Sequence, residues 1–166
     1  MTTSLEIRDA TAADLPAMLE IYNDAVLTTT AVWDDAPRTL SAHQQWFETK
    51  CAQGHPVLVA LRDSAVAGFC SYGPFRPWPG YRFTVENSIY THPTHRRCGV
   101  ARELLTELIE RATAQGMHCM IGGIEAQNLA SIRLHAALGY TPAAHLHQVG
   151  WKFERWLDLV LMERRL

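Results

Sequence analysis

An extended, β-branched segment that leads into an amphipathic helix is the feature that most constrains the fold. The segment YRFTVENSIYTHP, residues 81–93, is rich in β-branched and aromatic side chains and predicts a long strand. From Val100 to Ala112, apolar residues recur at the spacing of one helical face, with charged residues between them. A helix with one apolar face needs a sheet to cover, so the two segments together predict a layered domain.

Similar patterns on both sides of this unit predict the remaining elements. Further strands are predicted at residues 5–9, 57–61, 65–73 and 117–124, with one or two more in the tail around GWKFERWLDLVLM. Further helices are predicted to begin after the caps Thr11/Asp14 and Ser41/Gln44, and to span residues 126–138. The order β-α-α-β-β-β-α-β-α-β-β indicates an α/β fold: a mixed sheet with helices on both faces. No repeat or linker interrupts it, so residues 1–166 are expected to form a single three-layer domain.

Composition excludes several classes of protein. The formal net charge of -2 argues against a general nucleic-acid binder, which needs a broad basic surface. The cysteines lack CxxC spacing, which favours free thiols in a reducing compartment over disulfides or metal ligands. No apolar signal region and no stretch of transmembrane length is present, so we expect a cytoplasmic protein without membrane contact.

The turn before the helix at Val100 concentrates positive charge. Arg96 and Arg97 precede Gly99, and the first N–H groups of a helix, together with its dipole, form a site that suits phosphate. Glycine would let a ligand approach the backbone closely. A solvated basic turn explains the same residues equally well. The pattern is neither a GxxxxGK[ST] loop nor a GxGxxG loop.

Two motifs in the correct order resemble one family. Arg96-x-x-Gly99-x-Ala101 resembles the acetyl-CoA signature of the GCN5-related N-acetyltransferases. The second motif of that superfamily is matched at Asn128, Ser131, His135, Gly139 and Tyr140. The segments RPWPGYRFTVENSIYTHPTHRRCGVA, QNLASIRLHAALGY and QVGWKFERWLDLVLM are similar to the phosphinothricin and methionine-sulfoximine acetyltransferases within it.

The resemblance implies the acyl-CoA N-acyltransferase fold, acetyl-CoA as cosubstrate and no metal. It places the pyrophosphate on the signature turn and the pantetheine arm along the preceding strand, whose backbone would polarise the thioester carbonyl. Asn128 would contact the arm while also capping its helix. The cofactor-binding residues implied are Ser88, Ile89, Tyr90, Arg96, Arg97, Cys98, Gly99, Val100, Ala101, Asn128 and Ser131.

The resemblance also implies acetylation of the α-amine of small amino-acid analogues: methionine sulfoximine, methionine sulfone or phosphinothricin. An ammonium group must lose a proton before it attacks a thioester, and Glu86 is the candidate base. Without the resemblance, a solvent-facing carboxylate is the simpler interpretation of Glu86. The predicted substrate-binding residues are Trp33, Phe75, Arg76, Pro77, Val85, Glu86 and Asn87.

Several assignments stay open at this stage. Arg76 is the better candidate to hold a substrate carboxylate, with Arg82 as the alternative, although strand alternation would pair Arg82 with Glu86. Trp33 fits either the pocket or the core. His135 stands where many superfamily members carry a tyrosine that is thought to protonate the leaving thiolate; a structural hydrogen bond is the favoured role here. His145 and His147 form an HxH pair for which spacing gives no third ligand, so no metal site is predicted.

Other functions remain as alternatives. A polyamine, an aminoglycoside or a protein N-terminus would be a different acetyl acceptor, and such cationic acceptors favour an acidic cleft. A non-catalytic acyl-CoA-binding module is a second class, against which Glu86 argues. The aromatic tail GWKFERWLDLVLMERRL suits a core strand or a subunit contact, and the resemblance favours a homodimer.

Overall fold

Strands and helices follow one another in the predicted order in the computed structural model, which describes residues 5–166. The strands are β1 (Leu5–Asp9), β2 (Val57–Arg62), β3 (Ala65–Pro74), β4 (Thr84–Thr91), β5 (Cys119–Glu125), β6 (Thr141–Lys152) and β7 (Arg155–Arg165). The α-helices are α1 (Leu15–Thr28), α2 (Leu40–Ala52), α3 (Val100–Ala114) and α4 (Leu129–Ala137). Short 3-10 turns, η1 (Ala12–Asp14), η2 (Pro79–Tyr81) and η3 (Pro93–His95), lie between them.

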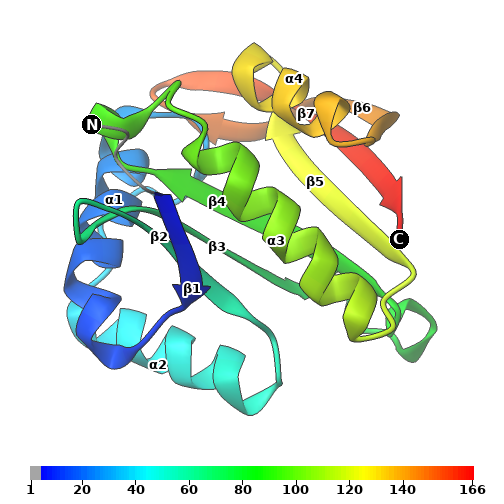
Figure 1. Ribbon diagram of the computed structural model, residues 1–166. Coiled ribbons are helices and arrows are strands. Elements are labelled where there is room, and N and C mark those ends of the chain that lie inside the picture. Colours follow the sequence, from blue (N-terminus) through cyan, green and yellow to red (C-terminus); the bar gives the residue numbers. More distant parts are fainter. Residues whose placement is uncertain (1–4) are drawn as a thin grey trace.

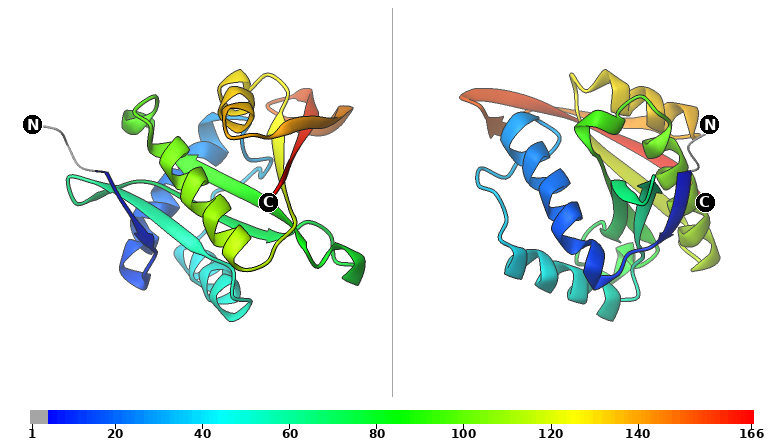
Figure 2. Two further views of the ribbon diagram at one scale, coloured as in Figure 1. Left: turned by 45° about the vertical axis from the view of Figure 1, so that its right-hand side comes forward. Right: turned by 60° about the vertical axis from the view of Figure 1, so that its left-hand side comes forward.

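The strands form one mixed sheet in the order β1-β2-β3-β4-β5-β7-β6. Strands β4 and β5 run parallel, and the other neighbours pair antiparallel. Helix α3 covers one face with Leu104, Leu105 and Leu108, each fully buried, and α1 covers the other with Met18 and Ile21. Figures 1 and 2 show these helices on opposite sides of the sheet. The predicted three-layer arrangement is confirmed.

Strands β4 and β5 separate before either of them ends. Within residues 5–166, their pairing runs from Thr84–Cys119 to Asn87–Gly122 and goes no further. Strand β4 continues to Thr91 and β5 to Glu125, and the two diverge visibly in Figure 1. The centre of the sheet therefore has a V-shaped opening, with backbone groups of β4 and β5 unpaired with each other inside it.

Local chemistry shifts several predicted boundaries. The cap of α2 is Thr39, whose hydroxyl accepts from the Ala42 N–H at 3.2 Å, so the predicted Ser41/Gln44 cap is wrong. The strand predicted over 81–93 shortens to Thr84–Thr91 because a proline begins a 3-10 turn at each side. Helix α4 begins at Leu129, later than the predicted residue 126, because Asn128 caps it as predicted. Among residues 5–166, no helix is long and apolar enough to span a membrane.

A buried lysine joins the β6–β7 hairpin to the end of α1. Lys152 is 3% exposed, and its ammonium donates to the carbonyls of Val26, Thr29 and Val32 at 2.6, 2.8 and 2.5 Å. Burial lowers the pKa of this ammonium, and the three carbonyl groups replace the water that it has lost. The loop that follows α1 is thereby fixed against the hairpin.

We expect Lys152→Met to lower the free energy of unfolding by at least about 3 kcal/mol, because it leaves three buried carbonyl groups without a donor and each costs about 1–3 kcal/mol. Urea denaturation followed by circular dichroism measures this loss. Lys50→Met is the matched control: the Lys50 ammonium donates to one carbonyl, that of Tyr72, at 2.8 Å. Its expected loss is about 1 kcal/mol, and equal losses in the two variants would contradict the role of Lys152 as a triple anchor.

Candidate active site

The turn between β4 and α3 holds its backbone in left-handed conformations. Arg97 has a φ of 60° and Gly99 a φ of 82°, which is the conformation that glycine adopts most readily. The Arg62 guanidinium donates to the Cys98 carbonyl at 3.1 Å and holds the turn from β2. Helix α3 then begins at Val100, and the N–H groups of its first turn have no partner within the helix. The turn therefore presents several backbone donors beside exposed arginines.

A cavity of about 860 Å³ occupies the opening between the diverging ends of β4 and β5. Nine of the eleven predicted cofactor-binding residues line it, namely Ile89, Tyr90, Arg96, Arg97, Gly99, Val100, Ala101, Asn128 and Ser131. Ser88 and Cys98 are not among its lining residues. The structure thus brings the signature turn, the end of β4 and the start of α4 together around one space. An anionic group at the turn and an extended arm along β4 fit the donors present there.

Other segments also line this cavity and were missed from the sequence. The end of α1 and its following loop contribute Thr28–Ala31, the β5–α4 segment contributes Glu125 and Gln127, and the tip of the last hairpin contributes Phe153 and Arg155. Glu125 is 5% exposed, and its carboxylate accepts from the Thr30 hydroxyl at 2.9 Å, which joins two walls of the cavity. No local pattern marks these residues, because only the tertiary fold brings them together.

A buried hydrogen-bond network joins β4 to α4 at the point where the strands separate. His135 Nδ1 lies 2.8 Å from the Ser131 carbonyl, which can only accept, so Nδ1 carries the proton. Nε2 then accepts from Asn87 Nδ2 at 3.0 Å, and Asn87 Oδ1 accepts from the Tyr140 hydroxyl at 3.0 Å. Burial lowers the pKa of His135, in keeping with a neutral ring. The structure therefore shows His135 in structural hydrogen bonds.

This network changes the prediction for two substrate-binding residues. The Asn87 side chain is 8% exposed and fully engaged with His135 and Tyr140. The Val85 side chain is 2% exposed in the core beneath α3. Neither side chain is open to a ligand in this structure, so a substrate at these positions would meet backbone groups. The prediction overlooked that alternate residues of β4 face α3.

Glu86 lies on the opposite face of β4. Its carboxylate packs over Gly123 so closely that a Cβ atom there would stand 2.7 Å from Glu86 Oε1. Burial raises the pKa of Glu86, and the nearby positive charge of Arg76 opposes that shift. The side chain is half-buried, which combines partial shielding from water with access from outside. This environment does not fit a carboxylate on an open solvent face.

The two candidate arginines have different surroundings. Arg76 is exposed in the segment after β3, stacks over the Phe75 ring at 4.8 Å and acts electrostatically on Glu86. Arg82 donates to the Pro79 carbonyl at 3.2 Å within its own turn and stacks over Phe83. The expectation that strand alternation pairs Arg82 with Glu86 is wrong, because β4 begins only at Thr84. Pro77 is exposed next to Arg76.

Trp33 packs between the loop after α1 and the last hairpin. Its indole N–H donates to the Thr30 carbonyl at 3.0 Å, and its ring touches Gly150, where a Cβ atom would lie 2.3 Å away. The side chain is half-buried. Trp33 is therefore a packing residue that holds the loop lining the cavity.

Comparison with known proteins agrees with this geometry. The model of the acetyltransferase (GNAT) family matches residues 18–140. The L-methionine sulfoximine/L-methionine sulfone acetyltransferase of Pseudomonas aeruginosa is 51% identical over 165 residues, covering 98% of this chain and 95% of its own. A phosphinothricin N-acetyltransferase of Alcaligenes faecalis is 39% identical over 158 residues, covering 92% of this chain and 78% of its own.

Solved structures show the same fold. The acetyltransferase yncA of Salmonella typhimurium, solved with acetyl-CoA, is 47% identical with a TM-score of 0.95, covering 98% of this chain and 94% of its own. A ribosomal-protein-alanine N-acetyltransferase from Brucella melitensis is 50% identical with a TM-score of 0.96, covering 97% of this chain and 99% of its own. The first of these similar structures carries the group for which the cavity is suited.

Proposed function

The chain belongs to the acetyltransferase (GNAT) family, and we propose that it acetylates the α-amine of small amino-acid analogues such as methionine sulfoximine, methionine sulfone and phosphinothricin. It is an acetyl-CoA-dependent N-acetyltransferase. One observation supports the substrate class: the half-buried Glu86 carboxylate lies within the electrostatic reach of the Arg76 guanidinium. A zwitterionic amino acid has the complementary pair of groups, an ammonium for the carboxylate and a carboxylate for the guanidinium.

The lining of the cavity suggests how the cosubstrate is held. The backbone donors of the turn that ends at Gly99, with Arg96 and Arg97, would hold the pyrophosphate. At Ile89 and Tyr90, the side of β4 that no longer pairs with β5 would pair with the pantetheine arm, and Asn128 would contact the arm from the start of α4. When bound, acetyl-CoA supplies a thioester whose acetyl group is transferred.

The residues of the chain would then prepare the amine. Glu86 takes the proton of the substrate ammonium, directly or through one water, and so frees the lone pair that attacks. Burial favours this role, because a carboxylate with a raised pKa is a stronger base than one in water. Arg76 holds the substrate carboxylate and orients the α-amine toward the opening between β4 and β5. Backbone donors at the end of β4 would stabilise negative charge on the carbonyl oxygen.

We also propose that residues 1–166 act as one cytoplasmic domain that forms a homodimer. The structure has four free cysteines, two of them exposed, which suits a reducing compartment. The β6–β7 hairpin carries large apolar side chains that are at least 40% exposed, namely Leu146, Val149, Trp151, Phe153 and Trp156. An exposed apolar surface of this kind is typical of a subunit contact.

A thiol-release assay with acetyl-CoA and a panel of amines tests the proposed function. We expect turnover with methionine sulfone, methionine sulfoximine and phosphinothricin. The panel also includes spermidine, an aminoglycoside and a peptide that starts with alanine, the last because of the name of the Brucella neighbour. Faster turnover of any of these three would assign a different acceptor. No turnover despite binding of CoA would indicate a binding module.

Glu86→Gln is expected to lower kcat with methionine sulfone by about 10²- to 10⁴-fold, the usual contribution of a general base. The wild-type rate should fall at acid pH as Glu86 takes up a proton. This fall should begin at a higher pH than for an ordinary glutamate, because the pKa of Glu86 is raised. That acid limb should disappear in the variant. Calorimetric binding of CoA should stay unchanged. A variant with normal turnover would refute the assignment of Glu86 as the base.

Arg76→Gln is expected to raise the KM for methionine sulfone by about 10- to 100-fold, because a charge-assisted hydrogen bond contributes about 1.5–3 kcal/mol. The matched control is Arg82→Gln, which removes an arginine six positions away that bonds within its own turn. A second control is the decarboxylated substrate, 3-(methylsulfonyl)propylamine, whose KM should be the same in wild type and Arg76→Gln. Equal effects of the two variants, or an effect on both substrates, would contradict the clamp.

A further inference from the structure

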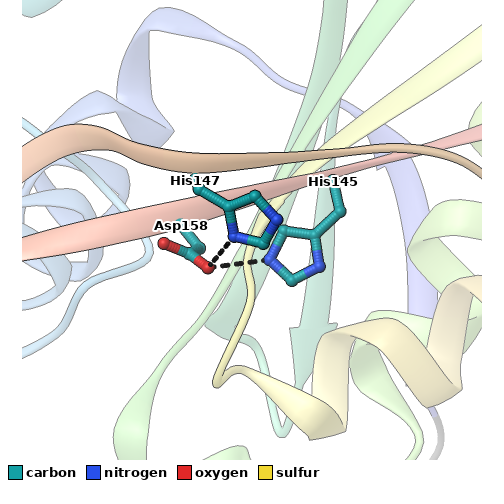
Figure 3. A group of neighbouring side chains, drawn as sticks. All are labelled: His145, His147 and Asp158. Atoms are coloured by element: carbon teal, nitrogen blue, oxygen red, sulfur yellow. Dashed lines mark hydrogen bonds and ion pairs between the residues drawn. The ribbon is translucent and has the colours of Figure 1, made fainter.

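Two histidines and an aspartate meet on the outer part of the sheet, away from the lining of the cavity. His145 and His147 lie on β6, and Asp158 lies on the neighbouring β7. Figure 3 shows both imidazole rings turned toward the same carboxylate oxygen. His145 Nε2 lies 2.8 Å and His147 Nδ1 3.0 Å from Asp158 Oδ2. The side chains are 48%, 75% and 31% exposed, so ions in solution can reach them.

The three groups are spaced as the ligands of one small cation. One ligand atom from each residue lies within 4.8 Å of the other two. A Zn²⁺ ion at about 2.0–2.1 Å from each of three tetrahedral ligands would place those ligands roughly 3.3 Å apart. The two separations to Asp158 Oδ2 are only a few tenths of an ångström shorter. The two rings are stacked with their centroids 4.4 Å apart, so the exposed side chains would rotate to bring both nitrogens around one ion.

The backbone around the cluster fixes the carboxylate for this role. The pairing of β6 with β7 shifts between Leu146 and Gly150, and Gln148 in this bulge has a φ of 52°. The Gln148 N–H donates to Asp158 Oδ1 at 2.9 Å, which leaves Oδ2 for the two rings. An outer partner that orients a ligating carboxylate is typical of metal sites.

From this geometry we infer that His145, His147 and Asp158 bind a divalent transition-metal ion of the Zn²⁺ class. Two imidazole nitrogens and one carboxylate are the ligands that such ions prefer, whereas Mg²⁺ and Ca²⁺ prefer oxygen alone. Each ring would bind the ion through the nitrogen that now faces Asp158 and carry its proton on the other ring nitrogen, and water would fill the open positions of the ion. It would join β6 to β7 across the bulge.

Spacing along the chain revealed no third ligand, because Asp158 follows His147 by eleven positions and lies on another strand. The β6–β7 hairpin brings Asp158 to the two histidines as a third ligand, so the reason for predicting no metal site no longer holds. A second close pair, His92 and His95, provides an internal comparison. Their ring centroids are 5.7 Å apart, but they do not belong to a group of three ligands among residues 5–166.

Titration of the full chain with ZnCl₂ by isothermal calorimetry, after treatment with a chelator, tests the inference. The background is Cys51→Ser/Cys98→Ser, which removes the two exposed thiols as competing ligands. We expect one equivalent of Zn²⁺ to bind. His145→Gln/His147→Gln and, separately, Asp158→Asn should each weaken binding at least about tenfold, a loss that removal of an outer partner alone can cause. His92→Gln/His95→Gln should bind as the background does.

A second readout separates loss of ligands from loss of fold. Zn²⁺ should raise the Tm of the background protein and leave that of His145→Gln/His147→Gln unchanged, because a ligand stabilises only the state that binds it. Circular dichroism without metal should show the same fold in both. Absence of saturable binding, or tight binding retained by the double-histidine variant, would overturn the inference. Neither readout involves acetyl transfer, so the outcome is independent of the proposed function.

Discussion

The separation of β4 from β5 after the Asn87–Gly122 pair is the constraint on which the rest of the site depends. Parallel strands normally continue their hydrogen-bond ladder, so a break in mid-sheet leaves backbone groups that need other partners. The signature turn, the end of β4 and the start of α4 all face this opening. A cosubstrate with an extended amide-containing arm can satisfy groups that a neighbouring strand would otherwise satisfy.

Two adjacent glycines allow side chains to pack against both faces of the sheet where it opens. A Cβ atom at Gly122 would lie 2.8 Å from the His135 ring, and one at Gly123 would lie 2.7 Å from Glu86 Oε1. On one face, the ring of His135 therefore reaches Asn87 and fixes β4 to α4. On the other face, the Glu86 carboxylate sits directly over β5 and loses part of its water. His135, which has a structural role, and Glu86, the proposed base, thus lie on opposite faces of β5 at its two adjacent glycines.

The sequence predicted what depends on local pattern and missed what depends on tertiary contact. The helix at Val100 and the cap at Asn128 are local, since each depends on residues within a few positions. The orientation of Arg82 was mispredicted because Arg82 caps the end of the turn η2, and β4 begins only at Thr84. Lys152 stands between two aromatic residues, Trp151 and Phe153, but its three carbonyl partners lie about 120 residues away.

The β6–β7 hairpin connects these distant parts. It contacts the end of α1 and the following loop through Lys152 and through Gly150, against which Trp33 packs. The Asp158 carbonyl accepts from the Ala126 N–H, two positions before Asn128, at 3.0 Å. Arg155 donates to Gln127 at 3.1 Å beside the cavity. Both walls of the cavity are thus bonded to one edge hairpin. An ion held by His145, His147 and Asp158 would cross-link the two strands of this hairpin at Asp158, whose carbonyl also accepts from the Ala126 N–H beside the cavity segment.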